Sequence, residues 1–312
     1  MAGLVHIRIL VAQERSDATL QYLLDRPGVT NVVRLAGVAL RPAGDVVLFD
    51  VAREAGNELL TELNERGLYD DGSLSVTHST LSMGWGVQHA LDEAPGEGDE
   101  TVLWAEVEAV VDRGMQVTPL LQAYFVVAAI IATAGVLTDS SILIVGAMVV
   151  GPEYGPIAAM SWYLQQRTGR PLARAAAVGA FGSAAAVAAA FVMTALLRWI
   201  DRIPEGFELG NQVNAGFIAH PDVFSAIVAS VAAVAGVLSL TFAHSSTLVG
   251  VLVSVTTIPA IAAIGIGAAV GDWHGAWGAA GQLGVNLGCL VVVGALTLAV
   301  LHRRAPRVPP RR

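Results

Sequence analysis

Six long apolar stretches fill the C-terminal two-thirds of the chain, and few charged residues interrupt them. A helix needs about 20 consecutive apolar residues to cross a bilayer, and each stretch has about that length or more. The stretches cover residues 119–137, 140–164, 172–199, 223–243, 245–270 and 274–301. The pattern predicts an α-helical polytopic transmembrane domain of about six helices over residues 119–301.

The N-terminal part has a different periodicity, with alternating segments separated by helical ones. Strand-like patterns and two amphipathic helical patterns follow one another in the order βαββαβ, which is typical of a ferredoxin-like α+β sandwich. The strands are expected at 6–12, 29–35, 46–51 and 73–78, and the helices at 16–26 and 54–66. We therefore expect a ferredoxin-like domain over residues 1–81.

The segment 82–118 joins the two parts. It contains an acidic linker, 94–99, that is rich in proline and glycine, followed by an amphipathic helical pattern over 103–114. We expect this helix to lie along the membrane surface or to pack on a neighbouring subunit.

Composition agrees with two compartments. Hydrophobic residues make up 54% of the chain and charged residues 14%, with a mean hydropathy of +0.61, values outside the range of ordinary soluble domains. Residues 1–118 hold nineteen Asp and Glu against eight Arg, whereas residues 119–312 hold seven against ten. An acidic soluble head and a membrane body follow from this division.

Charge also predicts the orientation. Arginine gathers in the loop around Arg167, Arg170 and Arg174 and in the basic tail 302–312, whereas the 200–222 loop is acidic. Positively charged loops remain on the cytoplasmic side, and the N-terminus shows no signal-peptide pattern. We expect a multi-pass protein of the cytoplasmic (inner) membrane with both termini in the cytoplasm. The single cysteine, Cys289, lies in an apolar helix and predicts no disulfide or thiolate metal site.

The membrane body contains an internal repeat. Residues 127–146 are echoed by 228–250, and both copies run through an apolar stretch into a proline. With three crossings in each half, repeats 119–199 and 223–301 have opposite topology. Inverted repeats of this kind are typical of secondary transporters, whose sites lie mid-membrane where helices are broken.

Two helices carry the expected breaks. The second contains Gly151, Pro152, Glu153, Tyr154, Gly155 and Pro156, and the fifth contains Ser254, Thr256, Thr257 and Pro259. Each proline removes a backbone donor and frees a carbonyl in a medium without water. The two breaks together predict a mid-membrane site for a substrate or an ion.

Glu153 is the main candidate, because a carboxylate at mid-bilayer costs about 2.5 kcal/mol or more. The structural alternatives are a position nearer an interface or a cap on freed amides. Tyr154 is either a gate or a packing residue. Asp139 and Ser140 are expected to cap the second helix, with a cation entrance as the bolder interpretation.

Further polar and small residues have structural interpretations. Gln122, Gln282 and Asn286 favour interhelical hydrogen bonds, with pore lining as the second interpretation. The small-residue runs 175–190 and 278–288 predict packing seams or a subunit interface.

Three stretches resemble a bacterial and archaeal membrane-protein family, the domain of unknown function family number 389. They are 145–157, 245–259 and Gly271-Asp272-Trp273. The resemblance implies the membrane fold and brings no settled activity. The family pattern has Ser-Pro and then apolar residues where this chain has residues 151–154, so a role for Glu153 is expected in a subgroup only.

These features favour a secondary transporter or channel for a small solute or ion, with the head as a regulatory or oligomerising domain. The alternative is a membrane-anchored sensor or scaffold without transport; a lipid-handling protein is a third interpretation. No catalytic, nucleotide or metal motif is found, so we expect no enzyme, no cofactor and no nucleic-acid partner. Expected partners are the lipid bilayer, the solute and further copies in a homo-oligomer.

Overall fold

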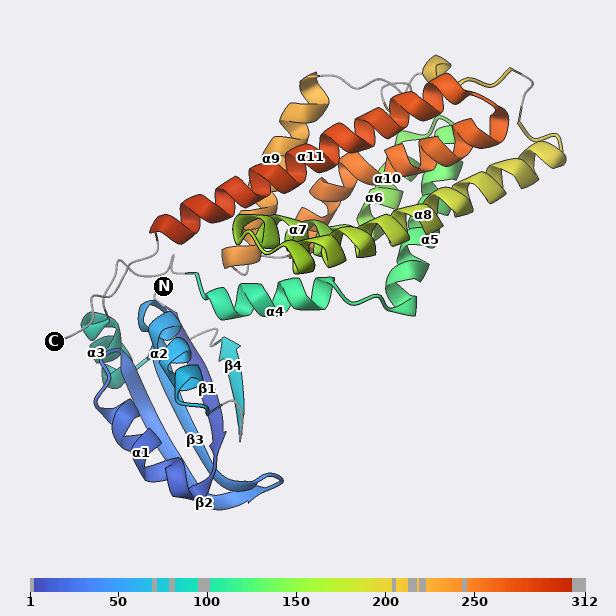
Figure 1. The fold of residues 1–312 in the computed structure, drawn as a ribbon. Coiled ribbons are helices and arrows are strands. Elements are labelled where there is room, and N and C mark those ends of the chain that lie inside the picture. Colours follow the sequence, from blue (N-terminus) through green and yellow to red (C-terminus); the bar gives the residue numbers. More distant parts are fainter. Residues whose placement is uncertain are drawn as a thin grey trace. The chain divides into compact units, whose positions relative to one another are not determined.

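The computed structural model describes residues 3–68, 72–78, 82–94, 102–203, 206–212, 218, 223–242 and 246–304, with backbone only for 78, 246–256 and 304. The chain forms two compact units (Figure 1). The head unit comprises Met1–Glu106 with Arg304–Arg312, and the helical unit comprises Val107–Arg303. The acidic linker, the basic tail and much of the 200–222 loop lie outside the described residues.

The head unit is a four-stranded antiparallel sheet with two helices packed on one face. Its elements are β1 Leu4–Val11, α1 Gln13–Leu24, β2 Val29–Leu40, β3 Ala43–Ala52, α2 Arg53–Glu65 and β4 Ser73–His78. The strand order is β2-β3-β1-β4. The predicted βαββαβ order is confirmed, and the β2–β3 hairpin is longer than its sequence pattern suggested.

Alternation along the central strands builds the head core. Val5, Ile7 and Ile9 of β1 face the helices, and Ile7 lies opposite Phe49 of β3. All four side chains are at most 1% exposed. Because side chains of a strand alternate between faces, the intervening residues of β1 are left on the open face of the sheet.

A buried carboxylate ties the hairpin to the rest of the head. Asp45, which is fully buried, accepts hydrogen bonds from Arg34 Nε and from the Gly37 N–H, both at 2.8 Å. The neighbouring Ser16 hydroxyl, the Gly37 amide and the Arg34 guanidinium hold the pKa of Asp45 below its usual range.

An additional helix, α3 (Trp85–Glu93), lies in the segment between head and membrane body. Its residues Val87 and Leu91 pack on Leu4 and Ala52 of the head. Sequence analysis did not predict this helix, because nine residues with two buried positions give little periodic signal.

The helical unit consists of long apolar helices. They are α4 Trp104–Gly114, whose first three residues belong to the head unit, α5 Pro119–Leu137, α6 Ser141–Val150, α7 Tyr154–Gln165, α8 Gly169–Trp199, α9 Val223–Phe242, α10 Ser246–Val270 and α11 Trp273–Arg304, with a short 3-10 helix at Leu209–Asn211.

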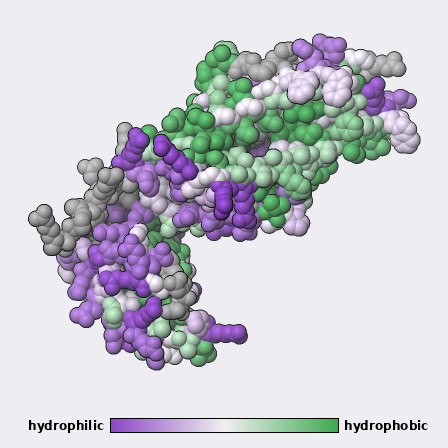
Figure 2. Space-filling view, in the orientation of Figure 1, coloured by the Kyte–Doolittle hydropathy of each residue, from purple (hydrophilic) through white to green (hydrophobic). Residues whose placement is uncertain are grey.

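Among the described residues, four helices are long and apolar enough to cross a membrane, or five if the bent pair α6–α7 is one span. They are α5, α8, α9 and α11. Only Thr257–Val270 of α10 enters this count, so the sixth crossing remains a prediction. Apolar side chains cover much of the visible surface of the helical unit, as Figure 2 shows. The chain is therefore a multi-pass membrane protein by composition and helix length.

Small residues let these helices pack closely. At Gly182 of α8, an added Cβ would lie 2.3 Å from the ring of Phe125 on α5. At Gly265 of α10, it would lie 2.6 Å from the Cβ of Ala190 on α8. The small-residue run 175–190 thus provides packing seams within one chain, as one of its two interpretations predicted.

The Gly271-Asp272-Trp273 motif connects α10 to α11. Gly271 has φ +89°, a conformation that favours glycine. Asp272 accepts hydrogen bonds from the N–H of Gly275 at 2.8 Å and from that of Leu209 at 3.0 Å. The carboxylate therefore caps α11 and fixes the loop that contains the 3-10 helix.

Candidate functional site: the broken helix α6–α7

The second apolar stretch is broken, as predicted, and its two halves are bent by 59° relative to each other. Helix α6 ends at Val150 and α7 begins at Tyr154, so the break itself is only Gly151, Pro152 and Glu153. Gly155 and Pro156, expected in the break, lie in the first turn of α7 instead.

Backbone chemistry explains this placement. The first N–H groups of a helix have no partner within it, so a proline there loses nothing. Pro156 is the third residue of α7. The first backbone bond of α7 runs from the Ile157 N–H to the Glu153 carbonyl at 3.1 Å, and the last of α6 runs from the Gly151 N–H to the Ala147 carbonyl, also at 3.1 Å.

The break brings two helix ends together inside the apolar unit. The carbonyl end of α6 carries partial negative charge and the amide end of α7 carries partial positive charge. In a bilayer, such ends require partners. Helix ends that meet in this way form ion and solute sites in membrane proteins.

Glu153 is at the amide end of α7 and is only 4% exposed. It occupies the N-cap position with φ −69° and ψ −19°, and its side chain makes no capping hydrogen bond. The capping interpretation of this residue is therefore wrong. A carboxylate buried at this position is stabilised by the helix dipole and is placed beside the freed backbone groups.

Tyr154 connects α7 to α9. Its hydroxyl donates a hydrogen bond of 3.0 Å to the carbonyl of Gly236. It also lines a small cavity of about 20 Å³ between α7, α9 and α11, with Ser161 and Gly294 among the other lining residues. A cavity of this size holds about one water molecule.

The fifth helix is not broken. Helix α10 runs continuously from Ser246 to Val270 with Pro259 inside it, so that part of the prediction is wrong. A single proline removes one backbone bond, and neighbouring helices allow a membrane helix to continue through it. In the second helix, by contrast, two prolines are accompanied by two glycines.

Helix α10 nevertheless meets the broken helix near its proline. Ile258 belongs to the same packed cluster as Ala147 and Val150, which form the last turn of α6. Thr257 is 2% exposed. The side chains of Ser254 and Thr256 lie outside the described residues.

Asp139 and Ser140 are remote from the break. Ser140 is the N-cap of α6 and accepts a bond from the Leu143 N–H at 3.5 Å, while Asp139 adopts φ +49° in the preceding turn. The ten residues of α6 separate them from the break by about 15 Å. The helix-capping role is confirmed for Ser140.

Buried amides lie elsewhere in the unit. Gln282 and Asn286 of α11 are 4% and 1% exposed. Among the described atoms, Gln282 Oε1 and both polar side-chain atoms of Gln122 have no hydrogen-bond partner. The described residues contain no group of three or more His, Cys, Asp or Glu side chains that could hold a metal ion.

Two contacts at the break were not predicted from sequence. An added Cβ at Gly114, the last residue of α4, would lie 2.8 Å from the backbone of Gly155. The Tyr163 hydroxyl of α7 donates a hydrogen bond of 2.7 Å to Asp112 Oδ1 of α4. The amphipathic helix thus packs on α7 of its own chain, with Val111 fully buried, instead of only on the membrane or on a neighbour.

Residues 148–292 match the family model described as "Domain of unknown function (DUF389)". The resemblance found in the motifs is confirmed over this segment. The DUF389 match begins in the last turn of α6, spans the break, and ends in α11. Comparison with curated proteins and with solved structures finds no match.

Proposed function

We propose that this chain passes a small ion or solute across the membrane at the break between α6 and α7, as a secondary transporter or a channel. The observation that carries the proposal is the burial of Glu153 at a helix break within an apolar unit. Burying a carboxylate there costs about 2.5 kcal/mol, a cost that packing alone does not require.

The chemistry of the break favours a proton or a small cation. Glu153 supplies a negative charge, and the end of α6 supplies carbonyl oxygens, which are the usual ligands of hard cations. The adjacent cavity, of about 20 Å³, is too small for an organic solute in this conformation. An anion would have to use the amide end of α7 beside the same carboxylate.

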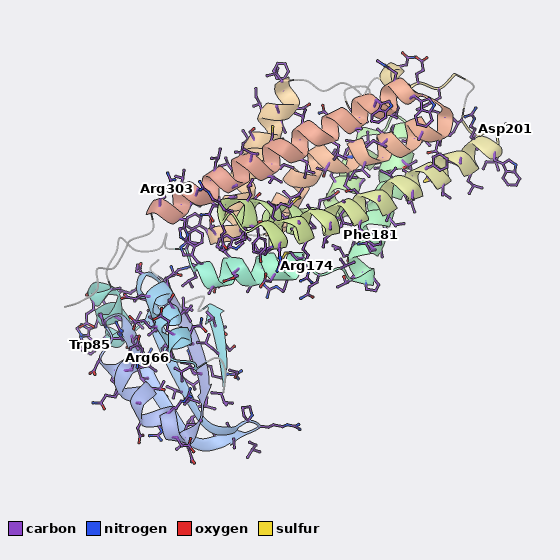
Figure 3. The ribbon with its side chains drawn as sticks, viewed as in Figure 1. Arg66, Trp85, Arg174, Phe181, Asp201 and Arg303 are labelled. Atoms are coloured by element: carbon purple, nitrogen blue, oxygen red, sulfur yellow. The ribbon has the colours of Figure 1, made fainter. Side chains whose placement is uncertain are left out.

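Charge placement supports the proposed orientation in the cytoplasmic membrane. Arg174 and Arg303 lie at one end of the helical unit and Asp201 lies at the other (Figure 3). We place the arginine end in the cytoplasm, with six crossings that include α10 and two inverted repeats. Trp199 and Trp277, which are 80% and 75% exposed, suit the interface at the opposite end.

We propose that the head is a ferredoxin-like regulatory or oligomerising domain. The open face of its sheet carries Val33 and Leu35, which are 46% and 40% exposed. Apolar side chains on an open sheet face favour pairing with another surface, and a homo-oligomer is the simplest arrangement that covers them.

Proteoliposome flux tests the transport proposal. The purified chain is reconstituted with an internal pH-sensitive or cation-sensitive dye, and Glu153→Gln is compared with the native protein. Loss of a charged ligand worth about 1.5–3 kcal/mol predicts a flux reduced about tenfold or more. Glu208→Gln, at an exposed residue of the loop after α8, is the matched control and should retain native flux.

The alternative, a membrane-anchored sensor or scaffold, predicts no flux of any tested ion in the native protein. In that case a phenotype would depend on residues 1–93 and be indifferent to Glu153→Gln. Equal flux in native and Glu153→Gln proteins would refute the role of this carboxylate.

A further inference from the structure

The start of α4 is fixed to the head unit. Asn57 of α2 donates from Nδ2 to the Val102 carbonyl at 2.7 Å, and its Oδ1 accepts the Trp104 N–H at 3.0 Å. Leu103, between these residues, is 1% exposed in the head core. An added Cβ at Gly56 would lie 2.9 Å from Leu103 Cδ2. Helix α4 therefore cannot shift at this end without displacing α2.

The end of α4 is fixed to the broken helix. Gly114 and Gly155 approach so closely that a Cβ on Gly155 would lie 3.0 Å from the Gly114 Cα. Gly155 is the second residue of α7, directly after the break. The bond from Tyr163 to Asp112 adds a second attachment between the same two helices.

Between these attachments α4 is one uninterrupted helix of 11 residues. Its rise of about 1.5 Å per residue gives a rod of roughly 16 Å. Coupling between distant sites is carried by rigid elements and packed contacts of this kind. The first attachment is made by residues of the head unit, and the second is made by residues of the helical unit.

We propose that α4 is a lever through which the head regulates the break in α6–α7. A displacement of α2 moves the start of α4, and the glycine contact transfers that movement to the amide end of α7, where Glu153 lies. The coupling stands on the contacts of α4, and its effect on an ion or solute rests on the proposed function.

Hydrogen exchange of the full chain in lipid nanodiscs tests the lever without a known substrate. Asn57→Ala removes both bonds to the start of α4, each worth about 1 kcal/mol. If about half of that free energy reaches the break, exchange of the 153–157 amides increases about fivefold. Asn64→Ala, at an exposed asparagine on the same helix α2, is the matched control and should leave these amides unchanged.

A second variant approaches the lever from its other end. Tyr163→Phe keeps the ring and removes only the hydroxyl bonded to Asp112, so the unit should still fold. We expect faster exchange of the 153–157 amides, and an effect in combination with Asn57→Ala that is smaller than the sum of the two. Tyr124→Phe, at a half-exposed tyrosine of α5, is the control.

The outcomes separate the two proposals. Exchange that changes only in the head and at residues 102–106 on Asn57→Ala overturns the lever, whatever the flux assay shows. An exchange response at 153–157 in a protein without flux supports the lever and refutes transport. Full additivity of Asn57→Ala and Tyr163→Phe overturns the lever, because the two changes would then act by independent routes.

Discussion

The contact between Gly182 and Phe125 gives the most direct test of how the helical unit packs. An alanine at Gly182 would place its Cβ 2.3–2.7 Å from three ring atoms of Phe125, whereas real Cβ contacts lie beyond 3.0 Å. Phe125 is fully buried and has no open space to enter. Gly182→Ala therefore forces α5 and α8 apart or pushes the ring off its rotamer.

Overpacking of this kind costs about 1–3 kcal/mol. The gain in helix propensity from glycine to alanine returns about 0.5–1 kcal/mol, which leaves a net loss of about 1–2 kcal/mol. For a unit of this size we expect the thermal midpoint to fall by about 2–8 °C. The assay is thermal unfolding of the full chain in detergent, followed by tryptophan fluorescence and repeated in nanodiscs.

Gly288→Ala is the matched control, because an added Cβ there meets nothing within 4 Å. It should be neutral or slightly stabilising through helix propensity alone. Combining Gly182→Ala with Phe125→Leu should recover part of the loss, since the smaller side chain makes room. A Gly182→Ala protein as stable as the Gly288→Ala protein would refute the close packing of α5 on α8.

The other predictions concern the head and the α10–α11 turn. The folded-state pKa of Asp45 is lowered, so its stabilising effect is fully present above the unfolded pKa of about 3.9 and is lost as pH falls through the lower folded value. Asp45→Asn should therefore flatten the acid limb of head stability below about pH 4, measured by exchange of β3 amides; an unchanged limb would contradict this. Asp272→Ala removes two hydrogen bonds and should cost about 1–3 kcal/mol, measured by thermal unfolding, with Asp201→Ala, at an exposed residue beyond α8, as the comparison.

Much of the secondary structure follows from the sequence, because local backbone chemistry and periodicity determine it. The alternation around Ile7 and the helical spacing of α2 predicted the head, and each long apolar run became a helix. Gly151 and Pro152 predicted the break, because these residues cannot continue a helix regardless of their neighbours. The break is shorter than expected, because Pro156 fits the first turn of α7.

Other features depend on contacts between residues far apart in the chain. Pro259 resembles Pro152 in sequence, yet α10 remains continuous, since the packing around a helix decides whether a lone proline interrupts it. Gly114 and Gly155, like Asp112 and Tyr163, carry no sequence pattern that pairs them. Only their approach in the folded chain shows that the amphipathic helix packs on α7.

The sequence by itself determined that this is a membrane protein with a separate head, because the free energy of burying apolar runs depends on composition and length. It also determined the position of the carboxylate at a helix break. The tertiary structure alone decided that Glu153 is buried without capping α7, that Tyr154 bonds to α9, and that α4 connects the head to the break. These features depend on how close two surfaces come, which only the packing of the folded chain determines.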